Sequence, residues 1–209
     1  MENAPPALDG VEKIRRAAAD LFGERGFDAV SIAHIAERAG SSKANIFHHF
    51  GSKEALYFAV LREAVDRSTD HFRDAMRAEL DPSQRVERAI RGSLTVLFED
   101  PERSRLIFRE IMESGPCRAE ALANEVFGDD FIALTRLFAD VQAGDEAGQG
   151  MSPSFLAHVL LSSNVMLFHC HQVLRHLPGG GYADEQERYI TMLRDVLLRS
   201  MRAQKETNA

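Results

Sequence analysis

Residues 31–56 read SIAHIAERAGSSKANIFHHFGSKEAL, a stretch that predicts two short helices around a tight turn and the start of a third. One face of the first short helix is apolar, through four residues at helical spacing: Ile32, Ile35, Ala36 and Ala39. Gly40 is expected to end that helix, because glycine readily takes the left-handed conformation found at helix C-termini. Ser41 or Ser42 is then expected to cap the next helix.

The second short helix spans only about two turns and is rich in small and polar side chains. Ile46 and Phe50 are expected to face inward. The side chains left to face elsewhere are Lys43, Ala44, Asn45, His48 and His49. Gly51 is expected to break this helix, and Ser52 to cap the third. A short helix presented beside a glycine turn fits the major groove of DNA, although similar helix pairs also occur in other all-helical proteins.

The motif I-A-x-x-A-G-x-S-K, followed by H-H-F and G-S-K-E-A-L, resembles the DNA-binding domain of the TetR family of bacterial regulators. The resemblance covers about residues 11 to 60 and is architectural beyond them. It implies an all-α chain with an N-terminal helix-turn-helix domain and a C-terminal domain for ligand binding and dimerisation. Three residues depart from the family pattern, which commonly has an apolar residue at Ser41, a glycine at Ala44 and a tyrosine at Phe47. The last change removes a hydroxyl that would bind phosphate.

We expect the helix from Ser42 to His49 to enter the major groove of a partly palindromic operator. Asn45, Lys43 and His48 are assigned to base edges or adjacent phosphates, because asparagine pairs with adenine whereas lysine favours guanine or phosphate. Contacts to the DNA backbone are assigned to Lys53, Ser31 and Phe47, with Phe47 acting by packing. The full set of predicted DNA-binding residues is Ser31, Ser42, Lys43, Ala44, Asn45, Phe47, His48, His49 and Lys53.

The net charge of the 209-residue chain is −7, which is unusual for a DNA-binding protein. Residues 1–55 contain seven Lys and Arg against eight Asp and Glu, so the rest of the chain carries nearly all of the excess negative charge. The local placement of cations decides phosphate binding, and Arg38, Lys43 and Lys53 lie in or beside the predicted reading helices. We expect the acidic remainder to limit nonspecific binding to DNA.

From its composition and N-terminal sequence, we expect a cytoplasmic globular protein. Hydrophobic residues make up 44% of it, enough for a sizeable core. No apolar stretch is long enough for a membrane span, and the N-terminus MENAPPALDG lacks the apolar run of a signal peptide. Cys117 and Cys170 lie far apart without a pairing pattern, which favours two reduced thiols.

The whole chain is expected to be helical, with about nine helices and no alternating strand pattern. The first helix stops at Gly26, and a long helix runs from Ser52 to about Leu80. Three later helices should begin where a capping residue precedes a proline: Asp81-Pro82, Asp100-Pro101 and Ser152-Pro153. Breaks are expected at Gly115-Pro116, at residues 144–150 and at residues 178–181. The predicted domains are residues 1–55 for DNA binding and residues 56–209 for ligand binding and dimerisation.

The last two helices carry apolar residues at alternating intervals of four and three, a spacing typical of packed helical seams. The predicted dimerisation residues are Leu156, Leu160, Ser163, Leu167, Leu174, Leu193 and Leu197. The family resemblance implies a homodimer in which two such hairpins form a four-helix bundle. That dimer would present two reading helices roughly 34–36 Å apart, one turn of DNA. The alternative is that both seams pack within one chain.

A region rich in phenylalanine lies between the reading helices and the predicted seam. In regulators that look like this one such a region encloses the effector site, so we expect a cavity for a small apolar effector, although most of these side chains will be core. The predicted ligand-binding residues are Phe72, Met76, Phe98, Phe108, Met112, Phe127, Phe131, Asn164, Phe168 and His171. Asn164 and His171 are candidate polar anchors, together with Arg109 and Glu113.

Other function classes have little support in the sequence. His169 and His171 diverge by about 200° around a helix, so they cannot share an ion, and no metal site is expected. No catalytic or cofactor-binding motif is present, so neither an enzyme nor a bound cofactor is expected. The favoured function is a repressor released from operator DNA by its effector. The open alternatives are a ligand-independent DNA-binding or architectural protein, and a redox-responsive regulator using Cys117 or Cys170.

Overall fold

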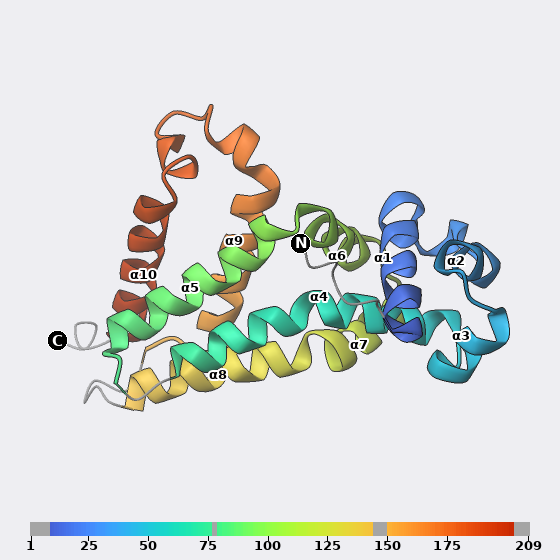
Figure 1. Ribbon diagram of the computed structural model, residues 1–209. Helices are drawn as coiled ribbons and strands as arrows, with labels where there is room; N and C mark the ends of the chain where they lie inside the picture. Colours follow the sequence, from blue (N-terminus) through green and yellow to red (C-terminus); the bar gives the residue numbers. More distant parts are fainter. Residues whose placement is uncertain (1–8, 77–78, 144–149, 203–209) are drawn as a thin grey trace, which may run out of the picture. The chain divides into compact units, whose positions relative to one another are not determined.

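The computed structural model describes residues 9–76, 79–143 and 150–202, which form helices and turns without β-strands (Figure 1). In chain order the elements are α1 (Gly10–Ala29), α2 (Ile32–Ala39), α3 (Lys43–Phe50), α4 (Lys53–Ala75), α5 (Pro82–Glu99), α6 (Pro101–Glu113), α7 (Pro116–Ala121), the π-helix η1 (Leu122–Val126), α8 (Gly128–Ala143), α9 (Pro153–Leu174), the 3-10 helix η2 (Gly180–Ala183) and α10 (Gln186–Arg202). The all-α class predicted from the sequence is confirmed, with ten α-helices in these residues where about nine were expected.

These helices belong to two compact units. The first unit runs to Ala64 and also takes in Glu102–Val126, whereas the second takes in Val65–Pro101 and the chain from Phe127 onward. Helix α4 therefore contributes residues to both units, and the first unit is built from two separate stretches of sequence. The predicted functional boundary between residues 55 and 56 stays a prediction.

The helix starts marked by a capping residue and a proline are confirmed. Helix α5 begins at Pro82, where the carboxylate of Asp81 accepts from the backbone N–H of Gln84 at 2.8 Å. Helix α6 begins at Pro101 and α9 at Pro153, the latter capped by the hydroxyl of Ser152. These caps satisfy backbone N–H groups that the first helical turn leaves without partners.

Two predicted helix ends differ in outcome. Gly26 has φ 78° and ψ 170°, so the helical run of α1 is broken there, as expected. The long helix α4 ends at Ala75 and not near Leu80, and Glu79 and Leu80 lie in a turn and a bend. The chain turns there because Asp81 must leave the helical conformation to cap α5. The loop expected at residues 144–150 lies outside the described residues except for its last member.

The core of the second unit is apolar with one buried polar side chain at its centre. Helices α5, α8, α9 and α10 supply most of the core, joined by Phe72 and Ala75 from the end of α4. Asn164 of α9 is fully buried, and its amide donates to the carbonyl of Ile90 at 3.1 Å and to the hydroxyl of Ser93. Its amide oxygen accepts from the hydroxyl of Tyr189 at 3.0 Å. These hydrogen bonds link α9 to α5 and α10 and meet the cost of burying an amide.

Candidate DNA interface

The turn between α2 and α3 has the caps that its sequence predicts. The hydroxyl of Ser31 accepts from the backbone N–H of His34 at 3.2 Å, and Gly40 ends α2 in the left-handed conformation, with φ 60° and ψ 38°. The hydroxyl of Ser42 accepts from the backbone N–H of Asn45 at 3.1 Å and so starts α3. Gly51 then ends α3 with φ 76°.

One side of α3 is buried and the other is open. Ile46 is fully buried, as are Ile35 of α2 and Phe22 of α1. Seven of the nine residues predicted to bind DNA are exposed: Ser31, Ser42, Lys43, Ala44, Phe47, His48 and His49. Asn45 and Lys53 are half-buried. The first unit therefore presents the outer side of α3 to solvent while its inner side is packed.

Asn45 is held by a neighbour that sequence reasoning overlooked. Its amide nitrogen donates to the hydroxyl of Ser41 at 3.1 Å, so a polar side chain occupies a position where the TetR pattern commonly has an apolar one. The hydrogen bond uses one amide hydrogen, which restricts the side-chain rotamer of Asn45. The signal was present in the sequence, because Ser41 precedes Asn45 by four residues, about one helical turn.

Lys53, the first residue of α4, lies over an aromatic ring. Its ammonium is 4.2 Å from the centroid of Phe27, and the guanidinium carbon of Arg118 is 4.5 Å from the same centroid. Both distances are typical of cation–π interactions. Phe27 also contacts the ring of Tyr57, at a centroid distance of 4.9 Å. Residues far apart in sequence meet here, so spacing alone gave no sign of this cluster.

A buried carboxylate lies behind this ring cluster. Glu110 of α6 is 6% exposed and accepts from the hydroxyl of Tyr57 at 2.8 Å and from the guanidinium of Arg118 at 3.3 Å. Burial raises the pKa of Tyr57 well above its ordinary value, and the hydrogen bond and negative charge of Glu110 raise it further. The phenol therefore stays neutral and donates a hydrogen bond to the carboxylate.

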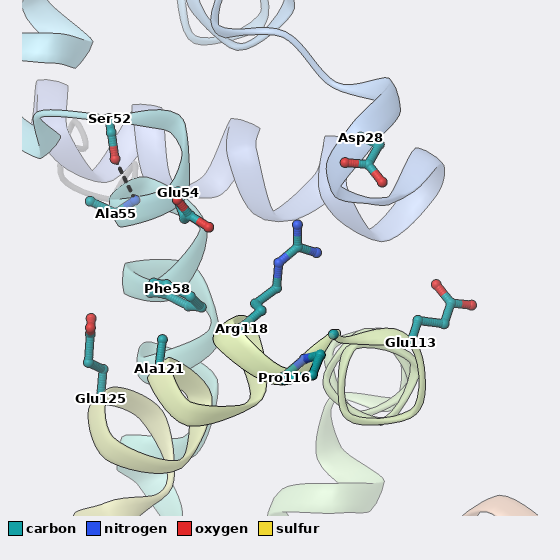
Figure 2. A pocket seen from close by; sticks show the side chains of 11 residues that line it. Asp28, Ser52, Glu54, Ala55, Phe58, Glu113, Pro116, Arg118, Ala121 and Glu125 are labelled. Atoms are coloured by element: carbon teal, nitrogen blue, oxygen red, sulfur yellow. Dashed lines mark hydrogen bonds between the residues drawn. The ribbon is translucent and has the colours of Figure 1, made fainter.

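The first unit also contains an open hollow of about 810 Å³ (Figure 2). Four carboxylates and one guanidinium contribute to its wall, from Asp28, Glu54, Glu113, Glu125 and Arg118. Figure 2 shows the side chain of Arg118 extending among these groups. The wall includes Glu113, one of the candidate anchors, but none of the predicted aromatic ligand residues. Its polarity differs from the apolar cavity expected for the effector.

The predicted ligand-binding residues are divided between the two units. Phe108 and Met112 belong to the first unit, and Met112 is 68% exposed. The other eight belong to the second unit: Phe72, Met76, Phe98, Phe127, Phe131, Asn164, Phe168 and His171.

Only some of the eight face one another. Phe98 of α5 meets Phe168 and His171 of α9 at ring-centroid distances of 5.1 and 6.3 Å. Phe72 is core, and the hydrogen-bonding atoms of Asn164 are engaged by the protein. Asn164 is therefore a structural link between helices, and its role as a ligand anchor stays a prediction without support from its geometry.

The predicted dimer seam faces inward in large part. Five of its leucines are no more than 8% exposed and lie in the core of the second unit: Leu156, Leu160, Leu167, Leu193 and Leu197. Ser163 and Leu174 are half-buried. These five leucines pack within the chain, as the alternative expects, and their role in dimerisation stays a prediction. The same two helices expose other apolar side chains: Phe155, Met166 and Val173 on α9, and Met192 and Val196 on α10.

The described residues contain no group of three or more His, Cys, Asp or Glu side chains that could hold a metal ion. Cys170 is a half-buried free thiol. Cys117 belongs to α7, but its side chain lies outside the described part of the structure. No helix within the described ranges is both long and apolar enough to cross a membrane.

The helices that frame α3 match a known family. Residues 14–60 match the model of the bacterial regulatory proteins of the tetR family. This segment is therefore similar to the N-terminal domain of the tetR family. The match covers most of α1, all of α2 and α3, and the start of α4 up to residue 60, so the resemblance noted in the sequence is confirmed where its motifs lie.

Curated relatives match about half of the chain. The transcriptional activator FasR of Mycolicibacterium smegmatis is 39% identical over 92 residues, which cover 44% of this chain and 42% of FasR. The transcriptional regulator RutR of Escherichia coli is 38% identical over 116 residues, which cover 56% of this chain and 52% of RutR. The matches thus span about half the length of these relatives.

Solved structures match nearly the whole chain in fold. GusR of Salmonella enterica superposes with a TM-score of 0.72 at 26% identity, covering 96% of this chain and 99% of GusR. FadR of Bacillus subtilis, solved in complex with stearoyl-CoA, has a TM-score of 0.69 at 14% identity, covering 91% of this chain and 97% of FadR. At such low identity the second likeness concerns the fold alone.

Proposed function

We propose that this protein is a transcriptional regulator that binds operator DNA through the exposed side of α3. The observation that carries the proposal is the contrast between the buried Ile46 and the open polar side chains on the rest of that helix. A helix capped at both ends and packed against α1 and α2 holds these side chains in a fixed frame, as groove reading requires.

The roles of individual side chains follow their chemistry and exposure. Asn45 and Lys43 are suited to adenine and to guanine or phosphate, respectively, and His48 lies exposed on the same helix. Ser31, Lys53 and Phe47 contact the DNA backbone, which fixes the position of α3 in the groove. Ser42 acts by capping the helix.

The test is selection of bound duplexes from a random-sequence library by the purified protein. We expect a partly palindromic consensus sequence. Its affinity for the protein should be about a thousandfold higher than that of a shuffled duplex at the same salt concentration. Equal affinity for the selected and the shuffled duplex would contradict sequence-specific regulation and favour an architectural binder.

We further propose that a small apolar effector binds in the second unit and lowers operator affinity, which makes the protein a repressor. The aromatic cluster of Phe98, Phe168 and His171 supports this proposal, since apolar pockets with few polar groups suit such molecules. A panel of fatty acids and aromatic acids should include a compound that weakens operator binding by a coupling of about 1–3 kcal/mol. Failure of every compound class to change operator affinity would favour ligand-independent binding.

The operator-binding form is proposed to be a homodimer. Support comes from the apolar side chains that α9 and α10 leave exposed, because patches of this kind mark interaction sites. Sedimentation equilibrium should give the mass of two chains at micromolar concentration. A monomer under those conditions, both free and on the operator, would contradict the proposal.

A further inference from the structure

The ring of Phe27 is shared by two cations that come from different parts of the first unit. Lys53 begins α4 and Arg118 lies on α7, yet their charged groups lie 4.2 and 4.5 Å from the same ring centroid. Lys53 is a predicted contact to the DNA backbone, whereas Arg118 is outside every predicted DNA-binding position. The ring therefore connects the first residue of α4 to α7, a helix that follows α4 after two intervening helices, α5 and α6.

Arg118 is itself fixed in place. Its guanidinium donates to Glu110 at 3.3 Å, and Glu110 is almost fully buried while it also accepts from Tyr57. The carboxylate offsets the charge of Arg118 and orients the planar guanidinium, which suits stacking on an aromatic face. Arg118 can therefore lie on the ring of Phe27 without leaving a second uncompensated charge next to Lys53.

Phe27 is fixed from the other direction. The helical run of α1 is interrupted at Gly26, which has φ 78°. In the preceding turn, the guanidinium of Arg109 donates to the carbonyl of Phe22 at 2.9 Å. The rings of Phe22 and Tyr57 contact Phe27 at centroid distances of 6.0 and 4.9 Å. With its backbone and edges held, the ring is a rigid support for the long, flexible side chain of Lys53.

We propose that Arg118 is a positioning residue for DNA binding: through the ring of Phe27, it holds the ammonium of Lys53 ready for a backbone phosphate. This inference rests on the proposed function, since it assigns a task within DNA binding. A lysine side chain otherwise loses rotamer freedom when it binds a phosphate, and holding it beforehand lowers that cost. Helices α6 and α7 thereby contribute to DNA binding, although they lie outside the residues that match the tetR family.

The test measures how binding of a short mixed-sequence duplex depends on salt, because phosphate contacts do not depend on sequence. Lys53→Met should lower the slope of log affinity against log salt by about one. Arg118→Met and Phe27→Leu should each lower the slope in the same direction in the wild-type chain. Neither should lower it further in the Lys53→Met background, and Arg118→Lys should restore part of the loss.

The matched control is Arg103→Met. Arg103 has a side-chain exposure of 30%, close to the 27% of Arg118, and it pairs with Glu63 of α4 at 3.6 Å. This change removes the same charge from the first unit and should leave the slope unaltered. An equal fall in slope for Arg103→Met would overturn the proposal by reducing the effect to net charge.

Circular dichroism and stoichiometric titration separate folding from positioning, because partial unfolding lowers the active fraction and not the slope of the remaining binders. Should Arg118→Met not fold, Phe27→Leu decides, since it leaves the pair of Arg118 and Glu110 intact. Slopes for Phe27→Leu equal to the wild type, or losses additive with Lys53→Met, would overturn the proposal while leaving DNA binding standing. Absence of any duplex binding by the wild type would instead overturn the proposed function and this inference together.

Discussion

At the scale of single residues, Asn45 is the side chain whose loss should change sequence preference most clearly. Asn45→Ala should cost about 1–3 kcal/mol of operator affinity and relax the preference at one base position, because it removes a paired set of hydrogen bonds to a base edge. Competition binding against operators substituted at each position measures both effects. Equal losses on the operator and on a random duplex would refute base reading by Asn45.

Ser41 should influence the same base position without touching DNA. Its hydroxyl accepts from the amide of Asn45, so Ser41→Ala should free that amide and reduce discrimination by about 0.5–1.5 kcal/mol, the net worth of one hydrogen bond. Ser41→Thr keeps the hydroxyl and serves as the control. Loss of discrimination at a different base position, or none at all, would contradict the assignment.

Tyr57 should make the fold sensitive to alkaline solution. Burial, with help from Glu110, raises the pKa of Tyr57 above its ordinary value of 10.0, so the unfolded chain loses this proton at a lower pH than the folded chain does. The contribution of the neutral Tyr57 phenol to the free energy of unfolding is fully present below about pH 10 and declines as the pH rises further. Tyr57→Phe should reduce this decline, as measured by urea unfolding at a series of alkaline pH values.

The matched variant for that titration is Tyr189→Phe in the second unit, whose phenol also has a pKa raised by burial. Each variant should remove its own part of the alkaline decline, and tyrosinate absorbance should show one fewer late-titrating phenol. A Tyr57→Phe chain with the wild-type dependence on alkaline pH would show that the phenol is not held neutral.

Sequence reasoning located residues well where the interactions are local. Ser42, Gly40 and Gly51 act on their own helix ends, and short-range rules suffice to predict such caps and breaks. The contact between Phe27 and Arg118 could not be predicted from the sequence, because it depends on how helices distant in sequence pack together. The sequence predicts Asn164 as a ligand anchor, whereas its hydrogen-bond partners on α5 and α10 follow only from how the helices pack.

At the scale of elements, α4 and α5 pack too closely in the second unit for any side chain at Gly92. A Cβ added to Gly92 would lie 2.4 Å from the Cβ of His71. Gly92→Ala should therefore destabilise the fold by about 1–3 kcal/mol, since the helices must move apart. Urea unfolding followed by circular dichroism measures the change.

Gly23 provides the matched control within a helix. Nothing lies within 4 Å of a Cβ added to Gly23, so Gly23→Ala should be neutral or stabilising by up to about 1 kcal/mol. If the two alanine variants had equal unfolding free energies, close packing at Gly92 would not be the cause.

Helix starts were predictable and one helix end was not, for a physical reason. A capping residue followed by proline specifies a start within three residues, as at Pro82 and Pro153. The end of α4 at Ala75 has no comparable signal, since the apolar pattern continues to Met76 and the chain leaves the helix only to reach the next cap.

At the scale of the whole molecule, side chains that face solvent, and not the core leucines, should decide dimerisation. Met166→Asp on α9 and Val196→Asp on α10 replace side chains that are 50% and 54% exposed, so each should weaken the dimer while the monomer stays folded. Sedimentation equilibrium together with circular dichroism measures both properties. Unchanged dimer affinity in both variants would exclude this face.

Leu160→Ala is the contrasting change, because Leu160 is fully buried in the core of the second unit. It should cost about 2–5 kcal/mol of folding free energy. Loss of dimer affinity without loss of folding stability would restore the seam predicted from the sequence.

The sequence could identify a seam on α9 and α10 but not its partner. Apolar residues spaced by three and four positions pack equally well against helices of the same chain or of another chain. Leu160 and Leu197 lie in the core with α5 and α8, which only the folded chain could decide.

The first unit is built from two separate stretches of sequence, which limits how the DNA-binding helices could be transferred into a chimeric protein. A graft that stopped after residue 60 would carry Phe27, Lys53 and Tyr57 but leave behind α6 and α7, whose Glu110 and Arg118 hold them. By the proposal above, such a chimera would keep the base preference of α3 but bind the DNA phosphates more weakly. An exchange of DNA-binding units between related proteins would therefore have to transfer both stretches of the first unit together.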